Sequence, residues 1–459
     1  MLSPKITLMV ILLAGAAATA GAVVASRFDF TPQPDFKPVS TPAEATPTVP
    51  ETKSPAPELP LGGSYDKCVR LGMPNSGNAR ERVTLCSRAL QSRTLTGDEV
   101  ALARLNRGAA RMALGDRIMA TGDYAEALRH YDSALDPSNP DALALYRRGA
   151  SLDALGQTDR ALSDFNKAIQ VAPNEPLAYF GRGVLLATRK RAYDRAIADF
   201  DRVLTLDPRN VSALMYRGDA YGQMGNFGHA LTDIDRAIAL APGISQSYVI
   251  RGLTNHRRGE DQLALQDYDA ALERHAQNID ALVNRAALYA TNRKMDLAIR
   301  DLDAALAIEC NNPTALYNRG FARFALGQYD RAIEDYGHAL GLEPTMGLAF
   351  NNRCMTRAVV GRDLVRALAD CDEALKLMPT NLDVRETRGF VYLKLGDPAI
   401  ALVEYEAALA VDPNRSRALF GRGLARIRQG QQQLGDEDQA AARALDPTVD
   451  DQFASYGLN

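Results

Sequence analysis

Apolar and small residues recur along this chain with a period of about 34 residues from residue 100 onward. Within each period, the larger apolar residues fall at helical rather than alternating spacings, as Leu145, Leu162 and Phe165 do. A small residue directly after an arginine marks each period, and further small residues follow at regular distances. The pattern predicts two amphipathic helices per period that approach closely through the small positions. The ten marker residues are Gly108, Gly149, Gly183, Gly218, Gly252, Ala286, Gly320, Cys354, Gly389 and Gly423.

This pattern resembles the tetratricopeptide repeat family, and the resemblance covers about residues 61–459. In the family's repeat frame the marker residue is position 8, the other small residues are positions 20 and 27, and proline is common at position 32. The resemblance implies an all-α fold, a right-handed superhelical solenoid of helix-turn-helix units. We expect about ten units and an N-terminal partial unit, because one unit cannot bury its apolar face alone.

The ends of the helices and of the solenoid also leave signals in the sequence. Four glycines stand where a first helix should end, which favours C-cap positions. Nineteen residues separate Gly108 from Ala127, against twelve in a standard unit, which predicts a longer helix in the first unit. Gly435 and Gln439 replace apolar residues in the last unit, which predicts a polar terminal cap. The four C-cap glycines are Gly156, Gly225, Gly327 and Gly396.

The N-terminal residues differ in composition from the repeats. Residues 6–25 are uncharged and follow Lys5, which is typical of a cleaved signal peptide or a retained membrane anchor. Nine prolines in residues 31–60 predict an extended linker or leader without a core. Both interpretations of residues 6–25 export the chain. The expected segments are 1–30, signal or anchor; 31–60, disordered linker; 61–100, partial unit; 101–447, solenoid; and 448–459, C-terminal tail.

Four of the five cysteines form two similarly spaced pairs. Cys354 and Cys371 occupy positions 8 and 24, which face each other across one helix pair, and Cys68 and Cys86 have nearly the same separation. We predict disulfides Cys68–Cys86 and Cys354–Cys371, with buried free thiols as the alternative. Cys310 is expected to be an unpaired, partly exposed thiol. The pairs resemble those of exported bacterial tetratricopeptide proteins, which implies a periplasmic protein, soluble or anchored to the inner membrane.

Charged residues form columns along the repeats. Position 7 is arginine in all ten units, and position 23 is acidic in nearly all, with His130 as the expected exception. We predict a structural Arg–Asp ladder, with polyanion binding by the arginines as the alternative. The net charge of −3 argues against nucleic-acid binding. Recurring Asp-x-Asp motifs do not predict a metal site, because residues two apart on a helix point in different directions.

The family resemblance implies that ligands bind on the concave surface lined by positions 5, 9 and 12 of the first helices. These positions form an aromatic-rich stripe that would suit an extended or helical peptide. The alternative is that the same side chains pack between neighbouring first helices. Tyr317, Phe321 and Phe324 form the best cluster for binding. The candidate partner-binding residues are Tyr146, Phe180, Met215, Asp219, Leu253, Tyr317, Phe321, Phe324, Met355 and Phe390.

Signatures of enzymes are missing from the sequence, which contains no phosphate loop and no nucleophile elbow. We therefore expect no catalytic residues, no metal and no cofactor. The interpretation that the sequence favours is an exported scaffold that binds a protein or peptide partner, with no nucleic acid, and with membrane anchoring through residues 6–25 left open. The alternatives are a structural spacer in an envelope assembly and an accessory subunit of an envelope enzyme.

Overall fold

The computed structural model describes Cys68 and residues 76–92, 94–113, 117–136 and 138–458. Within these ranges the chain forms 22 helices and no strand, so the predicted all-α class is confirmed. None of the described helices is both long and apolar enough to cross a membrane. The apolar run at residues 6–25 and the proline-rich segment at 31–60 lie outside the described residues.

Ten consecutive helix pairs form the body of the structure, which confirms the expected number of units. The first helices are α3 (Gly97–Ala113), α5 (Ala142–Ala154), α7 (Pro176–Thr188), α9 (Val211–Gln223), α11 (Ser245–Arg257), α13 (Ile279–Thr291), α15 (Pro313–Ala325), α17 (Gly347–Val360), α19 (Leu382–Leu395) and α21 (Ser416–Arg428). The second helices are α4 (Arg117–Ala134), α6 (Thr158–Val171), α8 (Tyr193–Leu206), α10 (Phe227–Leu240), α12 (Asp261–Arg274), α14 (Met295–Ile308), α16 (Tyr329–Leu342), α18 (Leu364–Leu377), α20 (Pro398–Leu409) and α22 (Gln432–Leu445). Helix α2 (Ser76–Gln91) precedes these pairs and α23 (Val449–Ser455) follows them.

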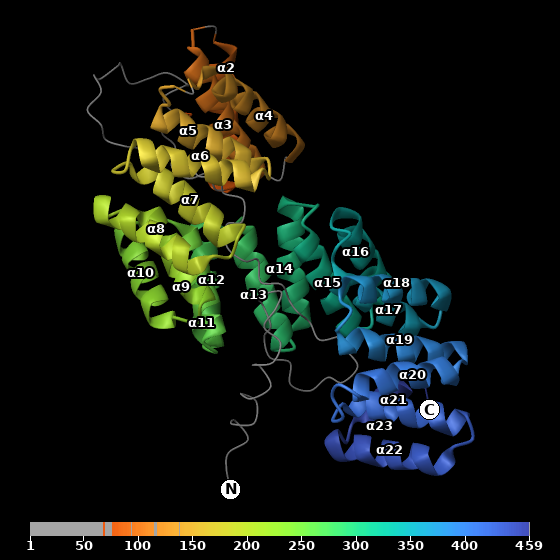
Figure 1. Cartoon of the computed structure of the whole chain (residues 1–459). Coiled ribbons are helices and arrows are strands. Elements are labelled where there is room, and N and C mark those ends of the chain that lie inside the picture. The colour runs from red at the N-terminus through yellow and green to blue at the C-terminus, as the bar shows by residue number, and fades with distance from the viewer. Residues whose placement is uncertain (1–67, 69–75, 93, 114–116, 137, 459) are drawn as a thin grey trace.

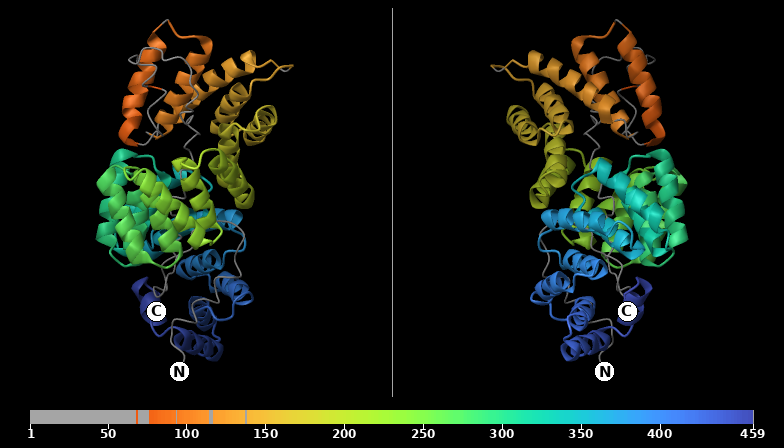
Figure 2. Two further views of the ribbon diagram at one scale, coloured as in Figure 1. Left: turned by 90° about the vertical axis from the view of Figure 1, so that its left-hand side faces the viewer. Right: turned by 90° about the vertical axis from the view of Figure 1, so that its right-hand side faces the viewer.

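The pairs stack into a superhelical solenoid that curves from α2 at one end to α22 at the other (Figures 1 and 2). Each helix packs against the helices before and after it in the chain, and each first helix from α5 onward also contacts the next first helix. The first helices therefore form one continuous side of the solenoid. We call this side, from α5 to α21, the inner surface.

Local sequence explains where many of the helices begin and end. Asn210, Asn278 and Asn312 cap first helices by accepting a hydrogen bond from the backbone N–H three residues later. The four glycines predicted to end first helices have φ angles of 72° to 80°, a left-handed conformation that costs glycine little. This confirms the predicted turn between the two helices of a unit.

The small residue at position 8 lets the two helices of a unit approach closely. A Cβ atom added at Gly320 would lie 2.8 Å from the ring of Tyr336, and one added at Gly149 would lie 2.8 Å from the ring of Phe165. In both units the ring is fully buried against the glycine. The aromatic residue at position 24 thus fills the space that the missing side chain leaves.

The register of the first unit differs from the sequence-based expectation. Tyr124 packs against Gly108, sixteen residues apart, as Phe165 packs against Gly149. Ala120 therefore holds position 20, and Ala127 holds position 27. The extra residues of the first unit do not lie between positions 8 and 20, as the sequence had suggested. The extra residues instead extend the far end of α4 and the loop that leads to α5.

Both predicted disulfides are present. Cys354–Cys371 joins α17 to α18 with the Cα atoms 5.6 Å apart, and Cys68–Cys86 joins Cys68 to α2 with the Cα atoms 4.9 Å apart. All four cysteines are fully buried, whereas Cys310 is an exposed free thiol, as expected. The Cys354–Cys371 disulfide takes the place of the glycine–aromatic contact within its unit.

Candidate protein-binding surface

The arginine column is occupied by contacts within the solenoid. Nε and Nη2 of Arg285 donate to the two carboxylate oxygens of Asp301 at 2.7 and 2.8 Å, in the second helix of the same unit. Nη1 donates to Asp269 at 2.7 Å, in the second helix of the preceding unit. Arg285 therefore joins two units, as Arg217, Arg251 and Arg319 also do, which favours the structural ladder over polyanion binding.

The Asp-x-Asp motifs are explained by the same ladder. Asp199 pairs with Arg182 of its own unit at 2.7 Å, whereas Asp201 pairs with Arg217 of the next unit at 2.6 Å. The inner acid, at position 23, is buried, and the outer acid, at position 25, is half exposed. The two carboxylates therefore bind different arginines instead of converging on one site.

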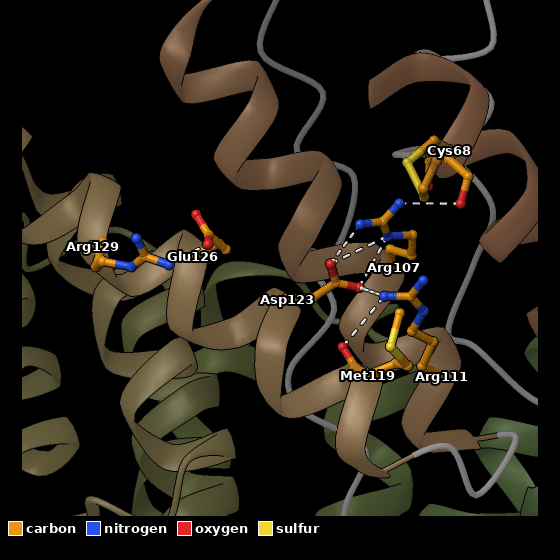
Figure 3. Close-up of polar contacts among 9 residues, drawn as sticks. Cys68, Arg107, Arg111, Met119, Asp123, Glu126 and Arg129 are labelled. Carbon is orange, nitrogen blue, oxygen red and sulfur yellow. Dashed lines mark hydrogen bonds and ion pairs between the residues drawn. A yellow bond between two sulfur atoms is a disulfide. The ribbon is translucent and has the colours of Figure 1, made fainter. Parts of the chain in front are cut away.

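The first unit follows the ladder as well, so the expected exception at His130 is wrong. Arg107 and Arg111 both donate to the buried carboxylate of Asp123 (Figure 3). Asp123 lies sixteen residues after Arg107, the usual separation, because the insertion comes later in the unit. If Ala127 is taken as position 20, His130 falls at position 23, which is the source of the wrong expectation. His130 contacts Asp98 at 2.6 Å.

The inner surface holds all ten candidate partner-binding residues, but their side chains are buried. None of the ten is more than 6% exposed. Phe180 of α7, for example, packs against Tyr216 of α9 with ring centroids 5.6 Å apart, edge to face. The expectation of an exposed aromatic stripe is therefore wrong for these residues, and the alternative of packing between first helices describes them. A role for them in partner binding stays a prediction. The ten are Tyr146, Phe180, Met215, Asp219, Leu253, Tyr317, Phe321, Phe324, Met355 and Phe390.

Polar side chains join neighbouring first helices along the inner surface. Gln246 of α11 donates to the half-buried Asp280 of α13 at 3.1 Å. Arg257 of α11 lies 3.8 Å from the buried carboxylate of Asp219 on α9. Burial raises the pKa of Asp219 to about 6, although Arg257 lowers it, and burial likewise raises the pKa of Asp280 to about 6. This part of the inner surface therefore carries two carboxyl groups whose pKa values are raised by burial.

The C-terminal segment, residues 449–458, covers part of the inner surface, which sequence reasoning did not predict. Phe453 lies 4.6 Å from Phe420 of α21 and 6.2 Å from Phe390 of α19, between ring centroids. Tyr456 lies 6.4 Å from Phe324 of α15. Two of the predicted partner-binding residues, Phe324 and Phe390, are thus in contact with the chain's own end. The spacing of Val449, Phe453 and Tyr456 along one helical face was the available signal.

Three histidines of the described residues take part in local polar contacts. In the described ranges, no group of three or more His, Cys, Asp or Glu side chains is placed to hold a metal ion. His256 contacts Asp261 at 2.6 Å and His229 contacts Asn226 at 2.9 Å, each within a single unit. The side chains that the structure brings together on the inner surface are therefore apolar contacts and ion pairs between helices.

The geometry defines a solenoid of stacked helix pairs with a continuous inner surface. Family models of the tetratricopeptide repeat match residues 146–211, 191–221, 215–279 and 387–450, and a second model of the repeat matches residues 313–346. These stretches together span about half of the chain. The chain belongs to the tetratricopeptide repeat family.

Curated relatives share only a short part of the chain. DnaJ homolog subfamily C member 3 of Homo sapiens is 34% identical over 97 residues, which are 21% of this chain and 19% of that protein. Hsp70-Hsp90 organizing protein 3 of Arabidopsis thaliana is 31% identical over 91 residues, 20% of this chain and 16% of that protein. The chain thus spans less than a fifth of the length of these relatives.

Solved structures resemble the chain at low sequence identity. The human IFIT1 dimer with m7Gppp-AAAA is 15% identical, covers 81% of this chain and 94% of its own, and has a TM-score of 0.47. The Cut9–Hcn1 hetero-tetramer of the APC/C is 14% identical, covers 83% and 88%, and has a TM-score of 0.46. These likenesses bear on neither the partner nor the ligand of this chain.

Proposed function

We propose that this tetratricopeptide protein is an exported scaffold that binds a protein partner through its inner surface. The observation that carries the proposal is the inner surface itself, a continuous face of first helices with polar side chains between neighbouring helices. Half-buried groups such as Gln246 and Asp280 offer hydrogen bonds and charge to a peptide lying along it.

Export is supported by the uncharged N-terminal run and by the two disulfides. Disulfides persist in oxidising compartments and are rare in reducing ones. Cys354–Cys371 is fully buried within one unit, so it contributes to the fold of that unit and is not an adventitious disulfide on the surface. We infer a periplasmic location, with the protein either free or held at the inner membrane by residues 6–25.

Affinity capture from the native cell envelope tests the binding surface. The full chain is compared with Asp280→Lys, which reverses a charge on the inner surface, and with Asp194→Lys, which makes the same change at an exposed position of α8. We expect Asp280→Lys to lose captured partners and Asp194→Lys to retain them. Equal capture by all three chains would refute the assignment of the inner surface.

Export is tested separately by thiol mapping of the protein isolated from its native cells. Alkylation before lysis, followed by mass mapping of unreduced peptides, should label Cys310 and leave the other four cysteines bridged. Alkylation of all five cysteines would contradict an oxidising location.

A further inference from the structure

The C-terminal segment, residues 449–458, contains the short helix α23 and packs against the inner surface with one apolar side. Val449, Phe453 and Leu458 are buried and Tyr456 is half-buried, whereas Asp451, Ala454 and Ser455 on the other side of the segment are exposed. Val449, Phe453 and Tyr456, which face the solenoid, are spaced four and three positions apart, the spacing by which amphipathic helices anchor in grooves.

We call the part of the inner surface under this segment the seat. It is lined by the aromatic side chains of Phe324, Phe390 and Phe420, from three first helices. Phe453 packs against Phe420 and Phe390, and Tyr456 packs edge-on against Phe390 at 6.3 Å and against Phe324 at 6.4 Å. Burial raises the pKa of the Tyr456 hydroxyl to about 12, with Tyr329 also raising it. The seat therefore selects apolar and aromatic anchors.

One polar contact fixes where the seated helix ends. Lys394 Nζ donates to the backbone carbonyl of Tyr456 at 2.6 Å, at the C-terminus of α23. Gly457 then adopts a φ of 75°, and Leu458 N–H bonds back to the Phe453 carbonyl at 3.0 Å. A lysine that donates to a carbonyl at the end of a helix recognises the backbone of that helix end and not the side chains of the helix. Any helix of suitable length could therefore use it.

The segment is attached to the solenoid in a way that allows it to leave. It follows a three-residue link after α22, and α22 already completes the tenth unit, with Asp438 paired to Arg422 at 2.6 Å. Helix α23 has only seven residues, and isolated helices of that length are marginal in water. The segment is thus helical because it is bound to the inner surface. If it were released, helix α23 would unfold.

We propose that this seat binds an amphipathic helix of a partner protein, with an aliphatic anchor followed by aromatic anchors four and seven positions later. The chain's own C-terminal segment occupies the seat as a competing ligand. The inference rests on the proposed function in assigning partner binding to the inner surface, and it adds the chemistry of the partner and a means of inhibition.

Fluorescence anisotropy with a labelled synthetic peptide of residues 447–459 tests this directly. The full chain is compared with Phe453→Ala/Tyr456→Ala, in which the tail loses two anchors. We expect the variant to bind the peptide at least tenfold more tightly than the unmodified chain, because its own tail competes less. A peptide carrying the same two alanines should bind at least tenfold more weakly to the variant.

Matched lysine variants test the seat itself. In the tail-weakened chain, Lys394→Met should lower peptide affinity on the order of tenfold, because a charged donor to the helix end is lost. Lys376→Met, at an exposed lysine of α18 that pairs with Glu373, should leave affinity unchanged. Equal effects of the two changes would overturn the placement of the peptide.

The remaining outcomes each decide the proposal. A tail-weakened chain that keeps its helical circular dichroism yet binds no peptide at ~1 mM would make the segment a permanent cap and overturn the proposal. If the double variant fails to fold, Tyr456→Ala alone replaces it, under the same criterion. A full chain that is dimeric by light scattering and becomes monomeric in the variant would place the tail on a second copy, and would overturn competition within one chain. Peptide binding without capture of an envelope partner would refute the proposed function and leave the seat intact.

Discussion

Arg285 offers the sharpest test of how the units are held together. Asp301, its inner partner, is 4% exposed and accepts two charge-assisted hydrogen bonds from the guanidinium. Arg285→Ala leaves this carboxylate buried without its cation and also frees Asp269 of the preceding unit. Breaking a buried pair on one side costs about 3–5 kcal/mol, and we expect about 3 kcal/mol here because water can reach the vacated space.

Two other variants set the scale for this value. Asp269 is half exposed, so Asp269→Ala should cost less than about 1 kcal/mol. Arg353→Ala should cost only about 1 kcal/mol, because Asp370 keeps its bond from Arg357 at 2.5 Å. Arg285 should therefore be the most sensitive of the three positions.

Guanidinium unfolding followed by circular dichroism gives the change in stability for each variant. Because repeat proteins unfold through coupled neighbouring units, hydrogen exchange of amides in α13 and α14 should be measured alongside. Exchange there should accelerate in Arg285→Ala, and much less in Asp269→Ala. A cost below about 1 kcal/mol for Arg285→Ala, or a larger cost for Arg353→Ala, would refute the reasoning.

Three further changes follow from other contacts. The raised pKa of Asp219 means that the folded chain binds a proton more tightly than the unfolded one, so wild-type stability should fall as pH rises from about 4 to 6. Asp219→Asn should make this slope shallower, while Asp280 still contributes to it, and should add about 2 kcal/mol at pH 7.5 in thermal unfolding. Gly320→Ala should cost about 1–3 kcal/mol through collision with Tyr336, and Tyr336→Leu should recover part of that cost, as a double-mutant cycle would reveal. Replacing Cys354 and Cys371 together by Ala should lower stability by about 3 kcal/mol, seen as an earlier unfolding midpoint; an unchanged midpoint would mean that the bridge constrains little.

The repeated columns made most of the fold predictable. Positions 8, 20 and 27 are small because two helices meet there, and this local requirement recurs in every unit. The same logic places Cys354 opposite Cys371 from the sequence alone. It also pairs the arginines from Arg148 to Arg388 with the acid of their own unit, because those two residues lie on helices that must be neighbours.

Relations between units were harder to predict. The outer acid of each Asp-x-Asp motif binds the arginine of the next unit, and this depends on how the units stack. The first-unit insertion was misplaced because Ala127 fits two positions of the frame equally well. The candidate stripe, including Tyr317, was predicted to face a partner, yet its burial depends on how closely successive first helices approach. The frame alone does not specify that distance.

The junction between α16 and α17 lacks the outer acid of the ladder. Gly337 stands at position 25 before Arg353, so that position offers this arginine no carboxylate, whereas Arg285 and Arg319 each reach an outer aspartate. A Cβ atom at Gly337 would lie 3.6 Å from Arg353 Nη1, which leaves room for an acidic side chain to approach it. The Cys354–Cys371 bridge lies within the following unit and adds nothing across this junction.

Gly337→Asp should therefore strengthen the junction between α16 and α17. We expect a gain of about 1 kcal/mol, part from replacing a glycine within a helix and part from the new ion pair. Gly337→Ala gains a similar amount through helix propensity alone, so stability by itself does not separate the two. The separation comes from Arg353→Ala as a second change, which should abolish the ion-pair part of the aspartate's gain and leave the alanine's gain intact. If both gains survive the loss of Arg353 equally, the outer acids do not join units, and the ladder acts only within each helix pair.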